Sequence, residues 1–398
     1  MQCYGELSGS PSWRDWRETA GVYWYSAQAA KISLIGRVFE PRSAKSMLKE
    51  LLLMERKKLY NVAVVGATGA VGQKMLETLE KRSFPVGELR PLASARSAGQ
   101  QVTFQGNTYT VQEATPEAFV GIDFALFSAG GSVSEKLAPA AVERGAVVID
   151  NTSAFRMLPE VPLVVPEVNA HKISQHRGII ANPNCSTIQM VVALKPIYDA
   201  YGIDRIIVST YQAVSGSGQA AIDELREQTR AVLDRQPANP QVLPVKSLPK
   251  HHPIAFNAIP QIDVFEENGF TREEMKMVNE TRKIFGDDSI QITATCVRIP
   301  VFYGHSESVY VETRKPFDLA EVRSLLESAP GVKVVDNLAE QEYPMAIDAE
   351  GRYDTFVGRI RRDLFHPRGL NMWIVSDNVL KGAALNAVQI AEYMVKSK

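Results

Sequence analysis

The cysteine within Asn182–Thr187 is the residue whose surroundings best suit a nucleophile. A short apolar strand is predicted before this stretch, and the apolar residues of Ile188–Lys195 predict a buried helix after it. Cys185 then lies at or next to a helix N-terminus, with Asn184 or Ser186 as the capping residue. Unpaired N–H groups and the helix dipole favour a thiolate there, which is the nucleophile that carbonyl chemistry needs. The alternative is a buried structural cysteine.

A histidine at the end of Arg298–His305 is the predicted partner of this cysteine. His305 follows a glycine at the end of a predicted strand, where its ring could be exposed in a cleft. With a pKa near neutrality it could serve as base and then as acid. Cys296 is a rival nucleophile, on the same strand face as Arg298 if the strand is regular. It lacks a helix terminus to lower its pKa, so Cys185 is preferred.

A glycine-rich turn near residue 66 provides the element that would bring a redox cofactor to these residues. Strand Leu59–Val65 is followed at once by Gly66-Ala-Thr-Gly-Ala-Val-Gly72, and then by a predicted helix at Gln73–Arg82. Strand, glycine turn and helix form the context of a dinucleotide-binding turn, in which glycines let the backbone approach a pyrophosphate. The spacing is G-x-x-G-x-x-G rather than G-x-G-x-x-G, and the glycine turn alone is a weak signal.

The residues after the second predicted strand, Val86–Leu92, indicate the type of nucleotide. An NAD site usually places an acidic residue about 20 residues beyond the turn, to bind the ribose hydroxyls. Here Ser94, Arg96 and Ser97 stand at this point instead. A cation and hydroxyls suit a 2′-phosphate, so NADP is the predicted cofactor. The alternative for Arg96 is a solvated loop residue.

The order of predicted elements indicates an α/β protein of two domains. Strands at 122–127 and 146–150 alternate with helices, which predicts a parallel, doubly wound Rossmann-type sheet. After residue 203 the strands look antiparallel, which predicts a second, α+β domain. We expect the NADP-binding domain at 59–184, completed by a C-terminal helix at 379–398, and the second domain at 185–378. Residues 1–58 are interpreted as an extension, either a mis-assigned start or a disordered arm, with a transit peptide as an alternative.

Composition excludes several classes of protein. The net charge of −1 gives no global field for nucleic acid or an anionic membrane, and no apolar run approaches a transmembrane span. The cysteines at 3, 185 and 296 have neither zinc-site spacing nor the number for a disulfide framework. We therefore expect a cytoplasmic protein without a metal, whose partner is a small-molecule substrate.

From about Tyr60 onward the chain resembles the aspartate-β-semialdehyde dehydrogenase family. Six motifs carry the resemblance, in the family's order: Gly66–Gly72, Ser153–Arg156, Asn182–Thr187, Thr210–Gly218, Arg272–Lys276 and Arg298–His305. It implies NADPH-dependent reductive dephosphorylation of aspartyl-β-phosphate to the semialdehyde, in the pathway to lysine, threonine and methionine. It also implies a catalytic domain that forms a homodimer or a dimer of dimers, and no metal.

The resemblance assigns roles to residues that match the motifs. Cys185 is implied as the thioester-forming nucleophile, His305 as the general acid and base, and Gln212 as a residue that orients substrate or thioester. Arg298 would grip the substrate α-carboxylate as a planar fork, and Glu273 would bind the amino group.

Further residues are implied for the phosphate and the cofactor. Arg156 and Lys276 would hold the phosphate, and Asn184 belongs to the substrate-binding set. Lys276 lies three residues after Glu273, so both share one helical face. The implied NADP contacts are Gly66, Thr68, Gly69, Ala70, Val71, Gly72, Arg96, Ser97, Ser215, Gly216 and Asn378.

Two alternatives remain open at the level of sequence. N-acetyl-γ-glutamyl-phosphate reductase uses the same cysteine and histidine chemistry, but an aromatic residue and proline typically follow its cysteine. Here Ser186 and Thr187 follow, and Glu273 suits a free amino group rather than an acetylated one. A non-catalytic NADP-binding regulator would be expected to lack a catalytic residue, whereas both Cys185 and His305 are present.

Overall fold

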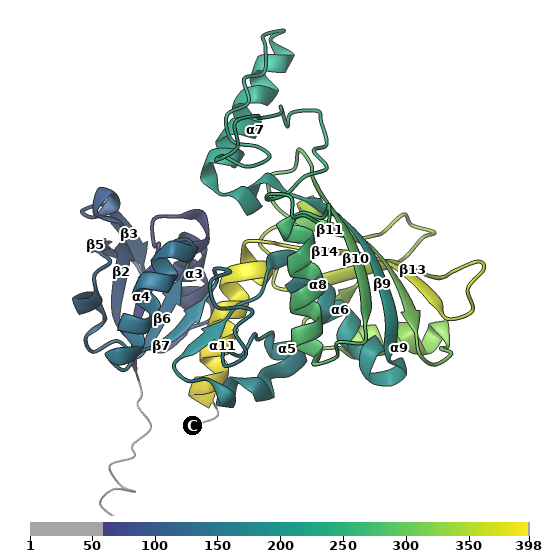
Figure 1. Cartoon of the computed structure of the whole chain (residues 1–398), viewed down its shortest axis with the longest axis horizontal. Coiled ribbons are helices and arrows are strands. Elements are labelled where there is room, and N and C mark those ends of the chain that lie inside the picture. Colours follow the sequence, from purple (N-terminus) through teal and green to yellow (C-terminus); the bar gives the residue numbers. More distant parts are fainter. Residues whose placement is uncertain (1–58, 397–398) are drawn as a thin grey trace, which may run out of the picture. The chain divides into compact units, whose positions relative to one another are not determined.

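A six-stranded parallel sheet forms the first half of the fold (Figure 1). The computed structural model describes residues 59–396, so the predicted extension at 1–58 lies outside it. The strand order is β5-β2-β1-β6-β7-β8, and every neighbouring pair is parallel, which confirms the predicted doubly wound sheet. Its strands are β1 (Tyr60–Val65), β2 (Val86–Ala93), β5 (Gln112–Glu113), β6 (Phe124–Phe127), β7 (Val147–Asp150) and β8 (Ile179–Ala181).

Helices cover both faces of this sheet, as its sequence requires. Val62 and Val64 of β1 pack with α3 (Ala70–Lys81) and α11 (Leu385–Lys396), whereas the intervening Ala63 packs toward α4 (Gly131–Glu143). A strand that is apolar on both faces can be buried only in this way. The C-terminal helix packs in the core of this sheet and begins with a π-helical turn, η5 (Leu380–Ala384).

The second sheet contains six strands in the order β10-β9-β11-β14-β13-β12. The expectation of an antiparallel sheet is wrong in part, because β9–β10 and β12–β13 are parallel pairs. The strand β13 was also missed, because a register shift after Gly358 breaks its alternation. The strands are β9 (Ile203–Gln212), β10 (Gln291–Arg298), β11 (His305–Thr313), β12 (Val332–Val334), β13 (Thr355–Arg362) and β14 (Gly369–Ser376).

Helix α6 (Cys185–Tyr201) packs against one face of the second sheet and against α8 (Arg272–Phe285) and α9 (Leu319–Ser328). It is buried on nearly all sides in its first ten residues, which explains why its sequence is apolar rather than amphipathic. The strand register sets polar residues in rows beneath it. Gln212 pairs with Arg298, and Thr210 pairs with both Cys296 and Glu307.

Shorter elements complete residues 59–396. Helix α7 (Gln219–Leu233) and the irregular segment after it project from the second sheet (Figure 1). The strands β3 (Gln101–Phe104) and β4 (Asn107–Thr110) pair as an antiparallel hairpin. The remaining elements are η1 (Ala95–Ser97), η2 (Pro116–Phe119), α5 (Pro166–Asn169), η3 (Ala170–Gln175), η4 (Val214–Ser217) and α10 (Ala346–Ala349). Within this range no helix combines the length and hydrophobicity that a bilayer crossing requires.

Candidate active site

Cys185 is the first residue of α6, as its sequence context predicts. Of the two candidate caps, the structure selects Asn184, whose Oδ1 accepts hydrogen bonds from the N–H groups of Ser186 at 3.0 Å and Thr187 at 3.2 Å. The short loop before Asn184 leads directly from β8 of the first sheet. The nucleophile candidate therefore lies where the first sheet ends and the helix covering the second sheet begins.

The predicted thiolate is not the resting form of Cys185. Burial, and to a smaller degree the nearby Glu273 carboxylate, raise the pKa of Cys185 to about 12. Arg298, Arg156 and the Ser186 N–H lower the same pKa, but their effect is smaller. The expectation from the helix N-terminus was wrong because it left out burial and the buried anion, which local sequence does not reveal.

The π-helical turn η5 packs directly against Cys185. A Cβ atom added to Gly382 of η5 would lie 2.7 Å from the Cβ of Cys185 and 3.1 Å from its Cα. Such distances are not tolerated between real atoms, so only glycine allows η5 to approach the cysteine this closely. Gly382 was missed by the sequence analysis, because a glycine within an apolar C-terminal helix carries no local signal of this contact.

Glu273 is the centre of a buried polar cluster beside the cysteine. Its Oε1 accepts hydrogen bonds from Asn184 Nδ2 at 2.8 Å and Gln212 Nε2 at 3.2 Å, and its Oε2 lies 3.1 Å from Lys276 Nζ. Burial alone raises the pKa of Glu273, but Lys276 and the two amide donors lower it to about 2. Glu273 is thus a carboxylate held ionised in a buried position. Lys276 is also paired with Asp263 at 3.0 Å.

Arg156 is anchored by a carboxylate that the sequence analysis missed. Its Nη1 donates to Glu280 Oε1 at 2.9 Å and its Nη2 to the Asn151 carbonyl at 2.8 Å. The other oxygen of Glu280 accepts from the backbone N–H of Asn184 at 2.7 Å. Glu280 therefore holds both an arginine and the loop before the nucleophile. Its spacing of seven residues from Glu273 places both on one face of α8, which is a signal that could have identified it.

Arg298 and His305 lie together behind the short η4 turn. Arg298 donates from Nη1 to the Ala213 carbonyl at 2.7 Å and from Nη2 to Ser217 Oγ at 2.9 Å. His305 accepts the Ala213 N–H at Nδ1, at 3.0 Å. A Cβ added to Gly216 would lie 2.9 Å from Arg298 Nη1 and 3.3 Å from His305 Nε2, so this glycine permits the close packing.

The structure corrects two expectations about His305. The residue begins β11 instead of following a strand end, and its side chain is fully buried rather than exposed in a cleft. Burial and then the charge of Arg298 lower its pKa to about 3, far from neutrality. Because Nδ1 accepts a hydrogen bond, the proton of the neutral ring is on Nε2. That nitrogen has no hydrogen-bond partner among the described residues.

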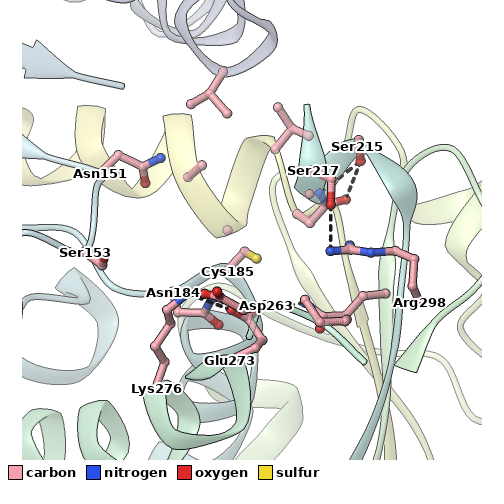
Figure 2. A pocket seen from close by; sticks show the side chains of 18 of the residues that line it. Asn151, Ser153, Asn184, Cys185, Ser215, Ser217, Asp263, Glu273, Lys276 and Arg298 are labelled. Atoms are coloured by element: carbon pink, nitrogen blue, oxygen red, sulfur yellow. Dashed lines mark hydrogen bonds and ion pairs between the residues drawn. The ribbon is translucent and has the colours of Figure 1, made fainter. Parts of the chain in front are cut away.

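A cavity of about 440 Å³ brings together most of the predicted residues (Figure 2). Figure 2 shows Cys185 between the cluster around Glu273 and the guanidinium of Arg298. Of the predicted catalytic and substrate residues, the lining contains Arg156, Asn184, Cys185, Gln212, Glu273, Lys276 and Arg298. His305 is not on the wall of this cavity. Cys296, the rival nucleophile, is also outside it, fully buried, and its pKa is raised by burial.

The predicted cofactor residues fall into two groups. Val71, Ser215, Gly216 and Asn378 line the same cavity, and the Asn378 side chain bonds both Ser215 Oγ at 3.0 Å and the Gly304 N–H at 3.0 Å. The others belong to the glycine turn or follow β2, and none of them lines this cavity: Gly66, Thr68, Gly69, Ala70, Gly72, Arg96 and Ser97.

The glycine turn has the geometry of a dinucleotide cradle. A Cβ added to Gly72 would lie 2.1 Å from the Gly66 carbonyl oxygen, and Gly66 itself has φ +89°. Both positions therefore require glycine. The turn leaves the N-terminal N–H groups of α3 without a side-chain cap, which suits a phosphate. Arg96 is exposed on η1 after the adjacent strand β2, and no described residue forms a salt bridge with it.

A cysteine-dependent, nicotinamide-dependent dehydrogenase requires a dinucleotide turn, a nucleophile and cations that bind the substrate. This protein has the glycine turn, and it has a cysteine at a capped helix N-terminus with cationic side chains around one cavity. Within residues 59–396 no group of histidine, cysteine and acidic side chains could hold a metal ion. Comparison with known proteins makes the class specific. Residues 61–176 match the family model of the semialdehyde dehydrogenase NAD-binding domain, and 194–381 match that of the dimerisation domain.

Individual relatives identify the family. The aspartate-semialdehyde dehydrogenase of Bacillus subtilis is 60% identical over 337 residues, which cover 84% of this chain and 97% of the relative. The crystal structure of Vibrio cholerae aspartate-semialdehyde dehydrogenase II in complex with ASA is 54% identical, with a TM-score of 0.81 over 85% of this chain and 99% of that one. The Candida albicans enzyme with NADP is 26% identical, with a TM-score of 0.66 over 84% and 98% of the two chains. This chain belongs to the aspartate-semialdehyde dehydrogenase family.

Replacing Glu273 with glutamine is expected to make Cys185 more reactive toward an uncharged alkylating agent. The Glu273 carboxylate raises the pKa of Cys185, so its removal lowers that pKa and increases the thiolate fraction at pH 8. Iodoacetamide alkylation of Cys185, followed by mass spectrometry between pH 7 and 10, measures the change. Asp199→Asn, which alters an exposed carboxylate on the same helix, is the control. An unchanged alkylation profile in Glu273→Gln would contradict the electrostatic account.

Replacing Gly382 with alanine is expected to destabilise the fold by about 1–3 kcal/mol, because the added methyl overlaps Cys185 and overpacks the site. Urea unfolding measures the loss. Gly131→Ala is the matched control, since its added methyl meets no atom within 4 Å. Equal stability of the two variants would show that η5 can move away from the cysteine at no cost.

Proposed function

We propose that this protein catalyses the NADPH-dependent reductive dephosphorylation of L-aspartyl-4-phosphate to L-aspartate 4-semialdehyde, in the biosynthesis of lysine, threonine and methionine. The observation that carries the proposal is the set of charges around Cys185. The buried carboxylate of Glu273 and the cationic side chains of Arg156, Lys276 and Arg298 line the same cavity as the cysteine, together with Asp263 and the exposed Lys246. The substrate has the complementary set: one ammonium, one carboxylate and one phosphate.

The ammonium and carboxylate groups on the substrate α-carbon find partners on different elements. Glu273 is ionised, with its pKa lowered to about 2, so it suits a free ammonium group. Arg298 on β10 presents a guanidinium to the cavity for the α-carboxylate, in the bidentate geometry that arginine favours. Gln212, next to Arg298 in the register, already bonds Glu273 and would orient the bound substrate or thioester.

Arg156 and Lys276 are assigned to the phosphate. Arg156 reaches the cavity from the loop after β7, and Lys276 reaches it from α8. A phosphate bound between them would be the leaving group when Cys185 attacks the substrate carbonyl. Both are held by carboxylates, Glu280 and Asp263, which fix their positions before the substrate arrives. Asn184 completes the wall, and its amide is directed to Glu273.

The reaction assigned to these residues has two stages at the cysteine. The sulfur of Cys185 attacks the acyl carbon, the bond from this carbon to the phosphate oxygen breaks, the thiol proton passes to the departing phosphate, and a β-aspartyl thioester remains. NADPH, when bound, supplies the hydride that reduces this thioester. The carbon–sulfur bond then breaks, the semialdehyde leaves, and Cys185 returns as a thiolate that takes up a proton.

The electrostatics suggest how Cys185 becomes reactive. The Glu273 carboxylate raises the pKa of the thiol in the free site. A substrate ammonium bound to Glu273 neutralises that charge, which lowers the pKa of Cys185 at the moment when the acyl group is in place. We assign His305 to donating a hydrogen bond from Nε2. Its neutral ring, with the pKa lowered to about 3, carries its proton there and does not act as the base that the resemblance implies.

NADP is assigned to the glycine turn and to the cavity wall that adjoins it. The cradle around Gly66 and Gly72 and the N-terminus of α3 fit the pyrophosphate, and Arg96 with Ser97 fits the 2′-phosphate. Ser215, Gly216 and Asn378 belong to both the cavity and the predicted cofactor set. The remaining predicted contacts are Thr68, Gly69, Ala70 and Val71. The domain limits of 59–184 with 379–398, and 185–378, stay part of this proposal.

Phosphate-dependent NADP reduction tests the function in the reverse direction. We expect turnover with aspartate semialdehyde plus phosphate, and none with N-acetylglutamate semialdehyde plus phosphate, because Glu273 needs a free ammonium. Cys185→Ala is expected to abolish turnover while NADP binding, followed by fluorescence, persists. Turnover by Cys185→Ala, or a preference for the acetylated substrate, would disprove the mechanism. Binding of NADP without turnover of either substrate would instead favour a non-catalytic regulator.

We also propose that the protein forms a homodimer through the open face of the second sheet. Ile207 is 36% exposed in the middle of β9, and Trp373 of β14 is partly exposed on the same sheet. Ile207→Lys places a charge on this face and is expected to shift the sedimentation coefficient to that of a monomer. The same substitution at Val232, which is exposed on α7, is expected to leave the coefficient unchanged. An unchanged coefficient in Ile207→Lys would place the interface elsewhere.

Because the chemistry needs Cys185 as a free thiol, we assign the protein to the cytoplasm.

A further inference from the structure

A second carboxylate, Glu307, is buried behind the site and has no role in the mechanism above. It lies two residues after His305 on β11, so both side chains point to the sheet face that α6 covers. Glu307 is 0% exposed, and neither of its carboxyl oxygens has a hydrogen-bond partner among the described residues. A buried carboxyl without partners is costly, so its retention calls for a specific explanation.

Gln189 is the polar group that α6 places opposite this carboxyl. It lies one helical turn after Cys185 and is 0% exposed. Its Nε2 donates to the backbone carbonyl of His305 at 3.3 Å, whereas its Oε1 has no donor within the described part of the chain. Gln189 therefore connects the helix that begins with the nucleophile to the first residue of β11.

The other neighbours of Glu307 leave it without an ionic partner. Its register partners are Thr210 on β9 and Ile374 on β14, and Cys296 lies beyond Thr210 in the same row. Thr210 donates its hydroxyl to Gln212. An ionised Glu307 would raise the pKa of the nearby Cys296 thiol, so these two groups do not stabilise a charge on one another. No cationic side chain faces the carboxyl from α6, β9, β11 or β14.

We propose that Glu307 and Gln189 form a buried side-chain pair that holds α6 against β11, and thereby sets the position of His305 relative to Cys185. Glu307 does not touch the substrate, so it is a positioning residue, and its kinetic role rests on the proposed function. The Gln189 side chain is near the Glu307 carboxyl, and the Gln189 Oε1 and both Glu307 oxygens are acceptors without a donor among the described residues. A proton on Glu307 supplies that donor.

The protonation state agrees with this geometry. Burial raises the pKa of Glu307 well above its usual value, and the nearby Gln189 amide lowers it only in part. Glu307 is then neutral in the folded protein, whereas it ionises near its ordinary pKa when the chain unfolds. The unfolded state binds fewer protons above that value, so this residue makes the protein less stable as pH rises.

Four variants test the proposal. Glu307→Gln keeps the shape and neutrality of the protonated acid, and Glu307→Leu and Gln189→Leu each remove one member of the pair. The fourth variant, Gln189→Leu with Glu307→Leu, removes both. Glu312→Gln is the control, because it removes a carboxyl from the same strand on the opposite face of the sheet. The unmodified protein must first turn over aspartate semialdehyde; failure there concerns the proposed function and not this pair.

We expect Glu307→Gln to keep kcat and to unfold at a higher temperature than the unmodified protein, with a larger difference at pH 8 than at pH 5.5. Each leucine variant is expected to lower kcat by up to about 100-fold with little change in KM, since a small misplacement of reacting groups has that effect. The double variant should be no slower than the slower single variant, because both act through one connection.

Three results would overturn the proposal. The first is a loss of kcat in Glu307→Gln equal to that in Glu307→Leu. The second is a loss of kcat in the double variant equal to the product of the losses in the two single variants. The third is a difference in unfolding temperature between Glu307→Gln and the unmodified protein that does not grow as pH rises. The unfolding measurement needs no turnover, so it tests the neutral carboxyl even if a leucine variant fails to fold.

Discussion

The site depends on one residue, Asn184, which makes three structural connections at once. Its amide oxygen caps α6, its amide nitrogen donates to Glu273, and its backbone N–H is held by Glu280. The nucleophile's helix is therefore fixed to α8 by hydrogen bonds that water cannot replace in a buried setting. Because Glu273 and Glu280 also hold Gln212 and Arg156, residues from both sheets are positioned around Cys185 through this asparagine.

The electrostatics of the site show a balance between binding and reactivity. A carboxylate kept ionised in a buried position is an effective receptor for an ammonium group, but the same charge suppresses the nearby thiolate. One residue, Glu273, produces both effects. If Glu273 binds the substrate ammonium as proposed, a substrate without this group would also fail to relieve this suppression, and recognition and activation would be coupled through a single charge.

Local patterns in the sequence predicted the elements whose causes are local. The glycine turn and the cap at Asn184 both depend on residues within a few positions, and both are present. The strand β13 was missed because a bulge interrupts its alternation, and the π-helical start of the last helix reflects packing against Cys185. The raised pKa of Cys185 and the burial of His305 follow from groups brought together by the fold, so no window of sequence could predict them.

The close approach of Gly382 to Cys185 also has a consequence for the growing polypeptide. The wall against the nucleophile comes from η5, which is synthesised long after α6. While the ribosome is still adding the second sheet, a nascent chain presents Cys185 without this wall. The thiol is then less desolvated, and its pKa is closer to that of a free cysteine. Its rate of reaction with oxidants and electrophiles is therefore highest during translation. Completion of η5 packs this side of the cysteine.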